Sequence, residues 1–214
     1  MRLQNHKLIF CDRVFHLKQL HHIYTELFEN NNTLSIMEKI AHAFFFDINN
    51  ILIDYFLLEV AKLTDPSCSQ QGKYENFTIN NLLETIDWPQ EHLIELESLN
   101  EIVMSFRKYI EPARNKILSH YDKKTLVSNR TIGAFKEGED QKLLQALEKM
   151  RNTMHKAVFG EILGDMIPFH NGDVLDFKKA LERAIAFKKL FSESKGADLD
   201  RLVNLLKQVR NGEI

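Results

Sequence analysis

The stretch SIMEKIAHAFFFDINNILIDYFLLEVAK, residues 35–62, decides the fold class. Ser35 followed by Glu38 has the spacing of a capping box, which predicts that a helix begins there. Phe44, Phe45 and Phe46 exceed what one narrow apolar stripe needs, which predicts a core helix buried on more than one side rather than an aromatic platform for nucleic acid. The helical period itself is set by seven large residues: Ile36, Ile40, Phe44, Ile48, Ile51, Tyr55 and Leu58.

Helical periodicity continues on both sides of this stretch. Only 8 Gly and 4 Pro interrupt 214 residues, which favours long helices joined by short loops. Pro112 predicts a kink or restart within the longest of them, because proline removes a backbone donor and clashes with the preceding turn. The fold class is therefore all-α, a bundle of about six or seven helices. The other helices are predicted at residues 6–29, 78–86, 90–119, 139–166, 174–192 and from about 197 to 208.

Two regions are expected along the chain. Residues 1–138 form a helical core, and residues 139–214 form C-terminal helices that pack on that core or extend from it. The polar run from Tyr121 to Gly138 is irregular and separates the two. Residues 67–76 are expected to form a polar loop around Gly72. The chain contains no internal repeat.

Composition excludes several classes of protein. With 44% apolar and 27% charged residues, the chain is neither disordered nor fibrous. No uncharged run approaches the roughly 18 residues of a membrane span, so no membrane partner is expected. Cys11 and Cys68 lie far apart and form no CxxC motif, which fits a reducing compartment. We therefore expect a cytoplasmic protein.

Basic residues are concentrated in one segment. The net charge is −2, yet residues 107–130 carry +5 and the remainder carries −7. A basic cluster on a helix can be a solvated face or a contact surface for nucleic acid, and charge alone does not separate the two. The residues expected to bind RNA are Arg107, Lys116, Lys123 and Lys124.

A short motif inside this segment carries acid–base chemistry. In RNKILSH, residues 114–120, Arg114 supplies a permanent cation and His120 an imidazole that titrates near neutral pH. Metal-independent RNA cleavage needs a base for the ribose 2′-hydroxyl, an acid for the 5′-oxygen and a cation at the phosphate. Asn115 can hold a phosphate or ribose oxygen, and Ser119 and Asp122 are weaker candidates. Asp122 either orients the imidazole or caps the turn.

Helix geometry shows that one copy of the motif is not sufficient. Six residues of ideal helix separate Arg114 from His120 by about 9 Å of rise and roughly 120° of rotation. Either the helix breaks before His120, or a second protomer brings its own pair to face the first. A two-fold homodimer would give a composite site with two of each residue. In the competing interpretation, Arg114 forms a surface ion pair with Glu111 and His120 is a helix C-terminal residue.

The motif resembles the R-x4-6-H signature of HEPN domains. Three ordered blocks strengthen the likeness to the AbiU-type abortive-infection branch of this superfamily. They are YFLLEVAKLTDP at residues 55–66, GKYENFTINNLLETI at residues 72–86 and RNKILSHYD at residues 114–122. The chain after about Gly138 resembles nothing further.

This resemblance implies a HEPN-like bundle, a homodimer formed through the motif-bearing helices, and a metal-independent endoribonuclease that forms 2′,3′-cyclic phosphate ends. It also implies RNA as substrate and no cofactor. The setting it implies is phage defence or a toxin role, with a cognate antitoxin or neighbouring regulatory protein as a candidate partner. Arg114, Asn115 and His120 match its site. The alternatives are a non-catalytic HEPN dimer that binds RNA or a partner protein, and a scaffold that uses its acidic helices.

Other candidate sites are rejected. Arg151 and His155 form a second Arg/His pair, but their spacing is one residue too short, and we expect them on a solvated face. No carboxylate lies three positions before any histidine, and neither H-E-x-x-H nor paired CxxC is present, so no metal site is expected. Gly133 and Gly138 have the spacing of a phosphate-binding loop, but the required Lys and Ser/Thr do not follow.

Overall fold

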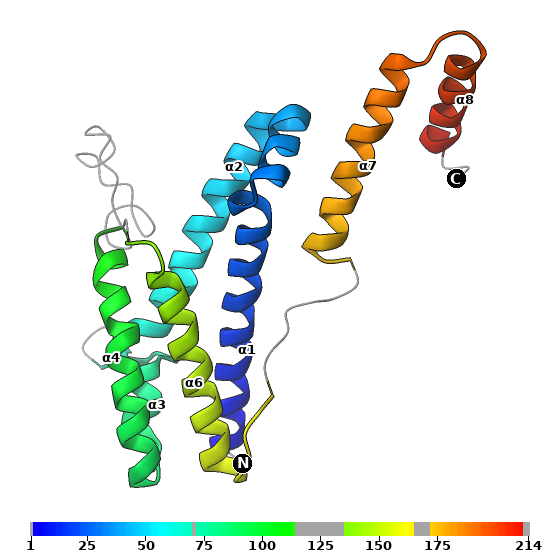
Figure 1. Ribbon diagram of the computed structural model, residues 1–214. Coiled ribbons are helices and arrows are strands. Elements are labelled where there is room, and N and C mark those ends of the chain that lie inside the picture. The colour runs from blue at the N-terminus through cyan, green and yellow to red at the C-terminus, as the bar shows by residue number, and fades with distance from the viewer. Residues whose placement is uncertain (1, 70–71, 114–134, 165–171, 212–214) are drawn as a thin grey trace. The chain divides into compact units, whose positions relative to one another are not determined.

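The protein is all-α, as the sequence predicts. The computed structural model describes residues 2–69, 72–113, 135–164 and 172–211. Within these residues the helices are α1 (Arg2–Tyr24), α2 (Asn31–Thr64), α3 (Ile79–Thr85), α4 (Gln90–Ala113), α6 (Glu139–Phe159), α7 (Val174–Glu193) and α8 (Ala197–Asn211) (Figure 1). A π-helical turn, η1 (Thr25–Glu29), follows α1, and a small hairpin joins β1 (Cys68–Ser69) to β2 (Tyr74–Glu75). None of these described helices is both long enough and apolar enough to cross a bilayer.

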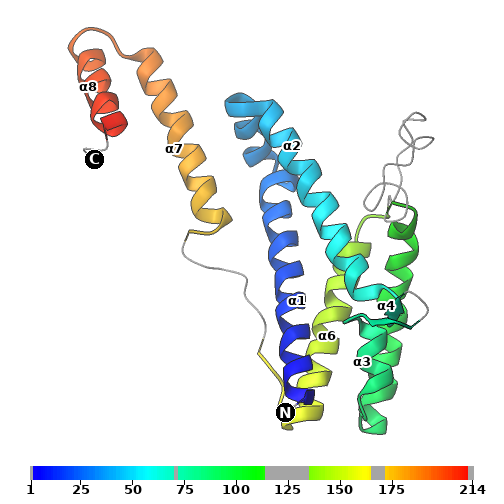
Figure 2. The same ribbon diagram turned by 180° about the vertical axis from the view of Figure 1, so that it is seen from behind.

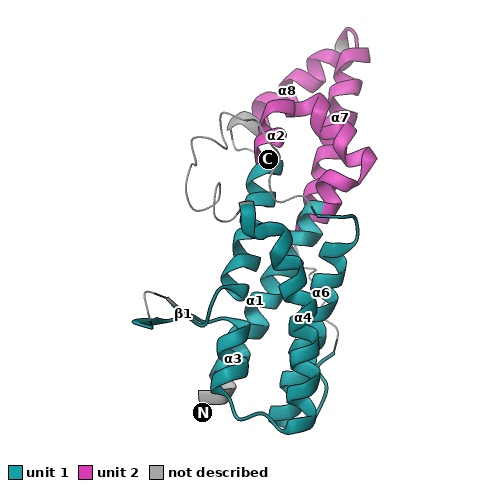
Figure 3. Cartoon of the chain, turned by 90° about the vertical axis from the view of Figure 1, so that its left-hand side faces the viewer, with its two compact units in different colours: residues 1–24, 49–168 teal, residues 25–48, 169–214 magenta. Residues whose placement is uncertain are grey.

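The chain forms two compact units (Figure 3). Unit 1 holds residues 1–24 and 49–168, and unit 2 holds residues 25–48 and 169–214. The helix α6 follows the predicted boundary at residue 138 and packs within unit 1 against α4 and α1. The predicted division into domains at that residue stays a prediction.

The core of unit 1 is built around α6, which lies between α4 and α1 (Figures 1 and 2). An apolar stripe along α6 is buried against both neighbours, while α3 and the last turns of α2 close the core. Trp88 seals the end of α3, where its indole nitrogen donates to the Leu82 carbonyl at 3.0 Å. The fully buried residues at the centre include Phe10, Leu17, Ile79, Leu96, Phe106, Ile110, Leu143, Leu147, Met150 and Met154.

The helix α2 differs from the prediction in three ways. It begins four residues before Ser35, because Asn30 caps it: the Asn30 side-chain oxygen accepts from the Thr33 backbone N–H at 3.2 Å. It is also interrupted at Ala41, where the backbone is not helical. The predicted burial on several sides is wrong, since Phe45 is buried but Phe44 and Phe46 are each 58% exposed. A run of three rings therefore places only one of them in the core.

Other boundaries follow local chemistry. The helix predicted to end at residue 62 ends at Thr64, and the predicted polar loop at residues 67–76 contains the β1–β2 hairpin, which the sequence does not reveal. The helix α6 ends at Phe159, not near Met166, because Gly160 takes a left-handed conformation at φ 78° and terminates it. The helix α4 ends at Ala113, and the predicted restart beyond Pro112 lies outside the described residues.

Unit 2 is smaller, and fewer of its described residues are buried than in unit 1. Phe45 packs near Phe177, with 6.3 Å between ring centroids, and Lys178 forms an ion pair with Glu26 of η1. Asp173 caps α7 by accepting from the Leu175 backbone N–H at 2.8 Å. Phe177 and Leu190 remain 42% and 58% exposed, so α7 covers only part of its apolar surface within this unit.

The packing of α4 gives a first prediction. We expect Leu96→Ala to lower the free energy of unfolding by about 2–5 kcal/mol, because Leu96 is fully buried and its loss leaves a cavity. The control is Ile94→Ala on the same helix, which removes a side chain 58% exposed and should cost less than about 0.5 kcal/mol. Urea unfolding followed by circular dichroism measures both. Equal losses in the two variants would contradict the assigned face of α4.

Candidate functional site

The predicted Arg/His motif follows directly on α4. The last residue of α4 is Ala113, and Arg114 is the next residue of the chain. The other residues predicted for the site also lie outside the described residues: Asn115, Lys116, Ser119, His120, Asp122, Lys123 and Lys124. Their roles stay predictions.

Arg107 is the one predicted RNA-binding residue whose place is described. It lies on α4, two turns before the motif, and its side chain is only 14% exposed. Its Nη1 donates to Asp65 Oδ1 at 3.1 Å and to Thr64 Oγ1 at 3.2 Å. The Thr64 hydroxyl in turn donates to the Val60 carbonyl at 2.9 Å, in the last turn of α2. Arg107 therefore ties α4 to the end of α2.

The segment tied by Arg107 leads straight into the hairpin. Asp65 and Pro66 precede β1, and two hydrogen bonds close the base of the hairpin. Asn76 donates through its side-chain nitrogen to the Pro66 carbonyl at 2.9 Å and through its backbone N–H to the Ser67 carbonyl at 2.8 Å. Arg107 thus holds the base of the hairpin beside α4.

The second Arg/His pair is buried, which overturns the prediction of a solvated face. Arg151 and His155 lie on α6 and are 3% and 8% exposed. The Arg151 Nη2 donates to the Gly164 carbonyl at 2.8 Å and to the Glu148 carboxylate. Buried polar groups need such partners. The missed signal is position, since both residues directly follow methionines of the buried stripe on α6.

His155 meets the buried Lys7 of α1. The Lys7 ammonium donates to His155 Nδ1 and lies 4.4 Å from the centroid of the Phe159 ring. The other ring nitrogen faces Glu161, with 3.7 Å between Nε2 and Oε1. Burial is the main cause that lowers the pKa of His155, and the Lys7 cation lowers it further. The imidazole is therefore held neutral at pH 7.

Cys11 and the possible metal ligands form no second reactive site in the described part of the chain. Burial raises the pKa of the Cys11 thiol, which keeps it protonated and unreactive. Cys68 is exposed on β1. Within the described ranges, no three His, Cys, Asp or Glu side chains are grouped so that they could hold a metal ion.

Comparison with known proteins places the chain. The family model HEPN_AbiU2, described as AbiU2, matches residues 11–184, which is more than half of the chain. The chain belongs to this family. The predicted likeness to the AbiU-type branch is thereby confirmed. No curated protein and no solved structure gives a significant match to the chain.

The contact between Lys7 and His155 predicts a dependence of stability on pH. The unfolded chain binds a proton at His155 once the pH falls below about 6.5, whereas the folded chain binds it only at lower pH. The free energy of unfolding should therefore be highest above pH 6.5 and fall as the pH decreases towards the folded-state pKa of His155. Urea unfolding between pH 8 and pH 5 measures this fall.

His155→Gln is the matched variant, because glutamine can still accept from Lys7 but does not titrate. Its unfolding free energy should fall less steeply with decreasing pH than that of the parent protein. His21→Gln serves as control, since His21 lies on the same helix pair, with its Nε2 2.7 Å from an Asp140 oxygen. Parallel curves for the parent and His155→Gln would show that His155 does not contribute.

Proposed function

We propose that this protein is a metal-independent endoribonuclease of the HEPN type that acts in phage defence or as a toxin. The observation that carries the proposal is the family match, which encloses Arg114 and His120 within residues 11–184. The residue types fit the chemistry, since an imidazole and a guanidinium supply proton transfer and charge stabilisation at phosphorus. The proposed substrate is RNA, contacted also by Lys116, Lys123 and Lys124.

The reaction needs no external reactant in its first step. The ribose 2′-oxygen loses its proton to a base and attacks the adjacent phosphorus. The bond from phosphorus to the 5′-oxygen breaks, and an acid gives that oxygen a proton. The products are a 2′,3′-cyclic phosphate and a 5′-hydroxyl. Arg114 stabilises the charge that develops on the phosphate oxygens, and Asn115 holds a phosphate or ribose oxygen.

We place the site at a homodimer interface. A single ideal helix separates Arg114 from His120 by about 9 Å and roughly 120°, whereas two copies related by a two-fold axis bring two imidazoles to one phosphate. One imidazole then serves as base and the other as acid. This arrangement supplies both proton-transfer groups from one type of residue.

Cleavage of mixed RNA in EDTA tests the activity. We expect the parent protein to cut RNA and His120→Ala to lose activity by about 10²–10⁴-fold, the contribution typical of general acid–base catalysis. His42→Ala is the control, because His42 is an exposed histidine on α2, and it should cut as the parent does. Light scattering checks that all three proteins are dimers. Retained cleavage by His120→Ala would refute the role of His120, and intact RNA with every protein would favour a non-catalytic, RNA-binding dimer.

Mixed dimers test the composite site. Parent and His120→Ala chains are unfolded together, refolded at varied ratios and assayed. If one site needs both imidazoles, activity falls with the square of the parent fraction, because only parent homodimers cut. If each protomer has an independent site, activity falls linearly with that fraction. A linear dependence would therefore reject the composite site while leaving the nuclease activity intact.

A further inference from the structure

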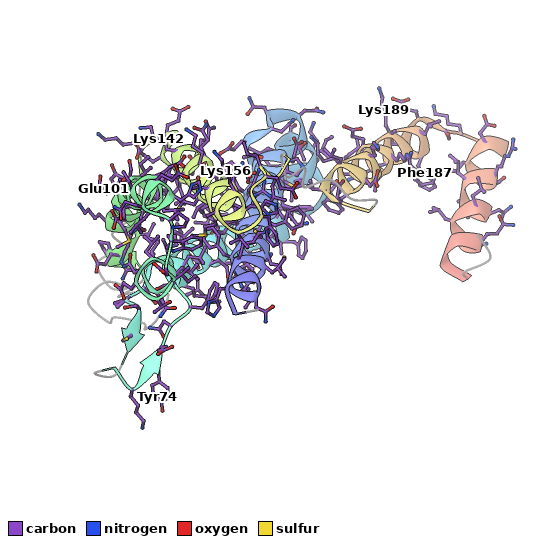
Figure 4. The ribbon with its side chains drawn as sticks, turned by 90° about the horizontal axis from the view of Figure 1, so that it is seen from below. Tyr74, Glu101, Lys142, Lys156, Phe187 and Lys189 are labelled. Carbon is purple, nitrogen blue, oxygen red and sulfur yellow. The ribbon has the colours of Figure 1, made fainter. Side chains whose placement is uncertain are left out.

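The β1–β2 hairpin presents an aromatic ring to solvent. Tyr74 lies on β2 and is 50% exposed. Figure 4 shows its side chain on the hairpin, away from the helices of unit 1. The Lys73 Nζ lies 5.4 Å from the centroid of the Tyr74 ring, so a cation accompanies the ring. The structure thus combines the two side-chain types that bind a single nucleotide, one for the base and one for the phosphate.

The hairpin is fixed at its base. Its strands pair antiparallel, with Ser69 opposite Tyr74, and Asn76 closes the base through Pro66 and Ser67. A ring on a fixed backbone loses little conformational freedom when a base stacks on it. Tyr74 is therefore suited to stacking, although it takes no part in the core.

Arg107 connects the hairpin to the helix that leads to the motif. Its guanidinium holds Asp65 and Thr64, directly before the hairpin, and it lies six residues before Ala113, the end of α4. Six helical residues correspond to about 9 Å along the axis. The basic segment of residues 107–130 begins on the same helix. The hairpin base is thus held close to the part of α4 that precedes the proposed site.

The geometry points to the β1–β2 hairpin as a binding site for single-stranded RNA, in which Tyr74 stacks on an unpaired base and Arg107 positions the hairpin relative to the motif-bearing helix. This inference rests on the proposed function for its substrate class. Stacking requires a base whose face is free, which single strands offer and the interior of a duplex does not. The hairpin therefore favours cleavage in unpaired RNA.

This assignment changes the role expected of Arg107. A guanidinium that is 14% exposed and engaged with Asp65 and Thr64 is a positioning residue, not a direct phosphate contact. Lys108, the next residue on α4, is exposed. It therefore serves as the matched surface cation for comparison with Arg107. The two roles differ in their salt dependence. A lost phosphate contact lowers the salt slope of single-strand binding by about 0.7, whereas a lost positioning residue leaves the slope unchanged.

The first experiment measures the affinity of the full-length protein for a fluorescent single-stranded oligonucleotide of about 12 nucleotides. Its riboses carry 2′-O-methyl groups, so binding is observed without cleavage. We expect Tyr74→Ala to weaken binding about 5- to 150-fold, the range that one stacked base contributes. Tyr74→Phe keeps the ring and should restore parent affinity. Phe46→Ala removes a ring elsewhere that is 58% exposed and should have no effect.

The second experiment is a double-mutant cycle between Arg107 and Tyr74. If Arg107 acts by holding the hairpin, Arg107→Ala weakens binding in the parent background but has little further effect in Tyr74→Ala, and the two losses are not additive. If Arg107 contacts RNA independently, the losses add and the salt slope falls. Circular dichroism confirms that both single variants keep the parent helix content.

The outcomes separate this inference from the proposed function. Tyr74-dependent binding by a protein that does not cut natural RNA would sustain the hairpin site and reject the nuclease. A protein that cuts RNA but binds the oligonucleotide equally well with Tyr74→Ala would sustain the nuclease and overturn the hairpin site. Absence of binding by the parent protein at low salt would also overturn the hairpin site. So would an equal loss of affinity in Tyr74→Ala for a duplex oligonucleotide and for the single strand.

Discussion

The burial of the apolar stripe of α6 is the constraint on which unit 1 depends. The stripe faces both α4 and α1, so it fixes these two helices with respect to one another. Polar pairs along the edge of the α1 contact, Lys18 with Glu148 and His21 with Asp140, set how α1 and α6 align. The proposed site lies in sequence between α4 and α6. Its flanking helices are therefore anchored by the same stripe that forms the core.

The sequence predicts the helices well because their apolar period is strong and their ends carry local signals. The helical stretch predicted to end at residue 29 ends there with η1, and the helix predicted to end at residue 62 ends at Thr64. Periodicity does not say how many faces of a helix are covered, so it predicts Phe44 and Phe46 in the core, whereas both are exposed. The capping box at Ser35 does not mark the start of α2, which Asn30 caps instead. Several polar residues precede this helix, and local spacing alone does not show which of them caps it.

Charge and motif were informative to different degrees. The spacing of Arg114 and His120, together with the two upstream blocks, identified the family, and the match over residues 11–184 confirms it. Local charge could not show the position of Arg107, because its carboxylate partner lies 42 residues away in the sequence. Arg107 counts towards the basic segment, but it is paired with Asp65, which follows the end of α2. Only the packing of α4 against the end of α2 reveals this.

The Arg151/His155 pair shows that environment, and not only spacing, decides whether an imidazole suits acid–base catalysis. A general acid–base group has to gain and lose a proton near the working pH. His155 is unsuited, because burial and the Lys7 cation lower its pKa, and both of its ring nitrogens face protein groups. Its neighbour Arg151 is likewise committed to Glu148 and the Gly164 carbonyl. Because this pair holds α6, α1 and residues 160–164 together, the proposal of chemistry on RNA rests on Arg114 and His120 alone.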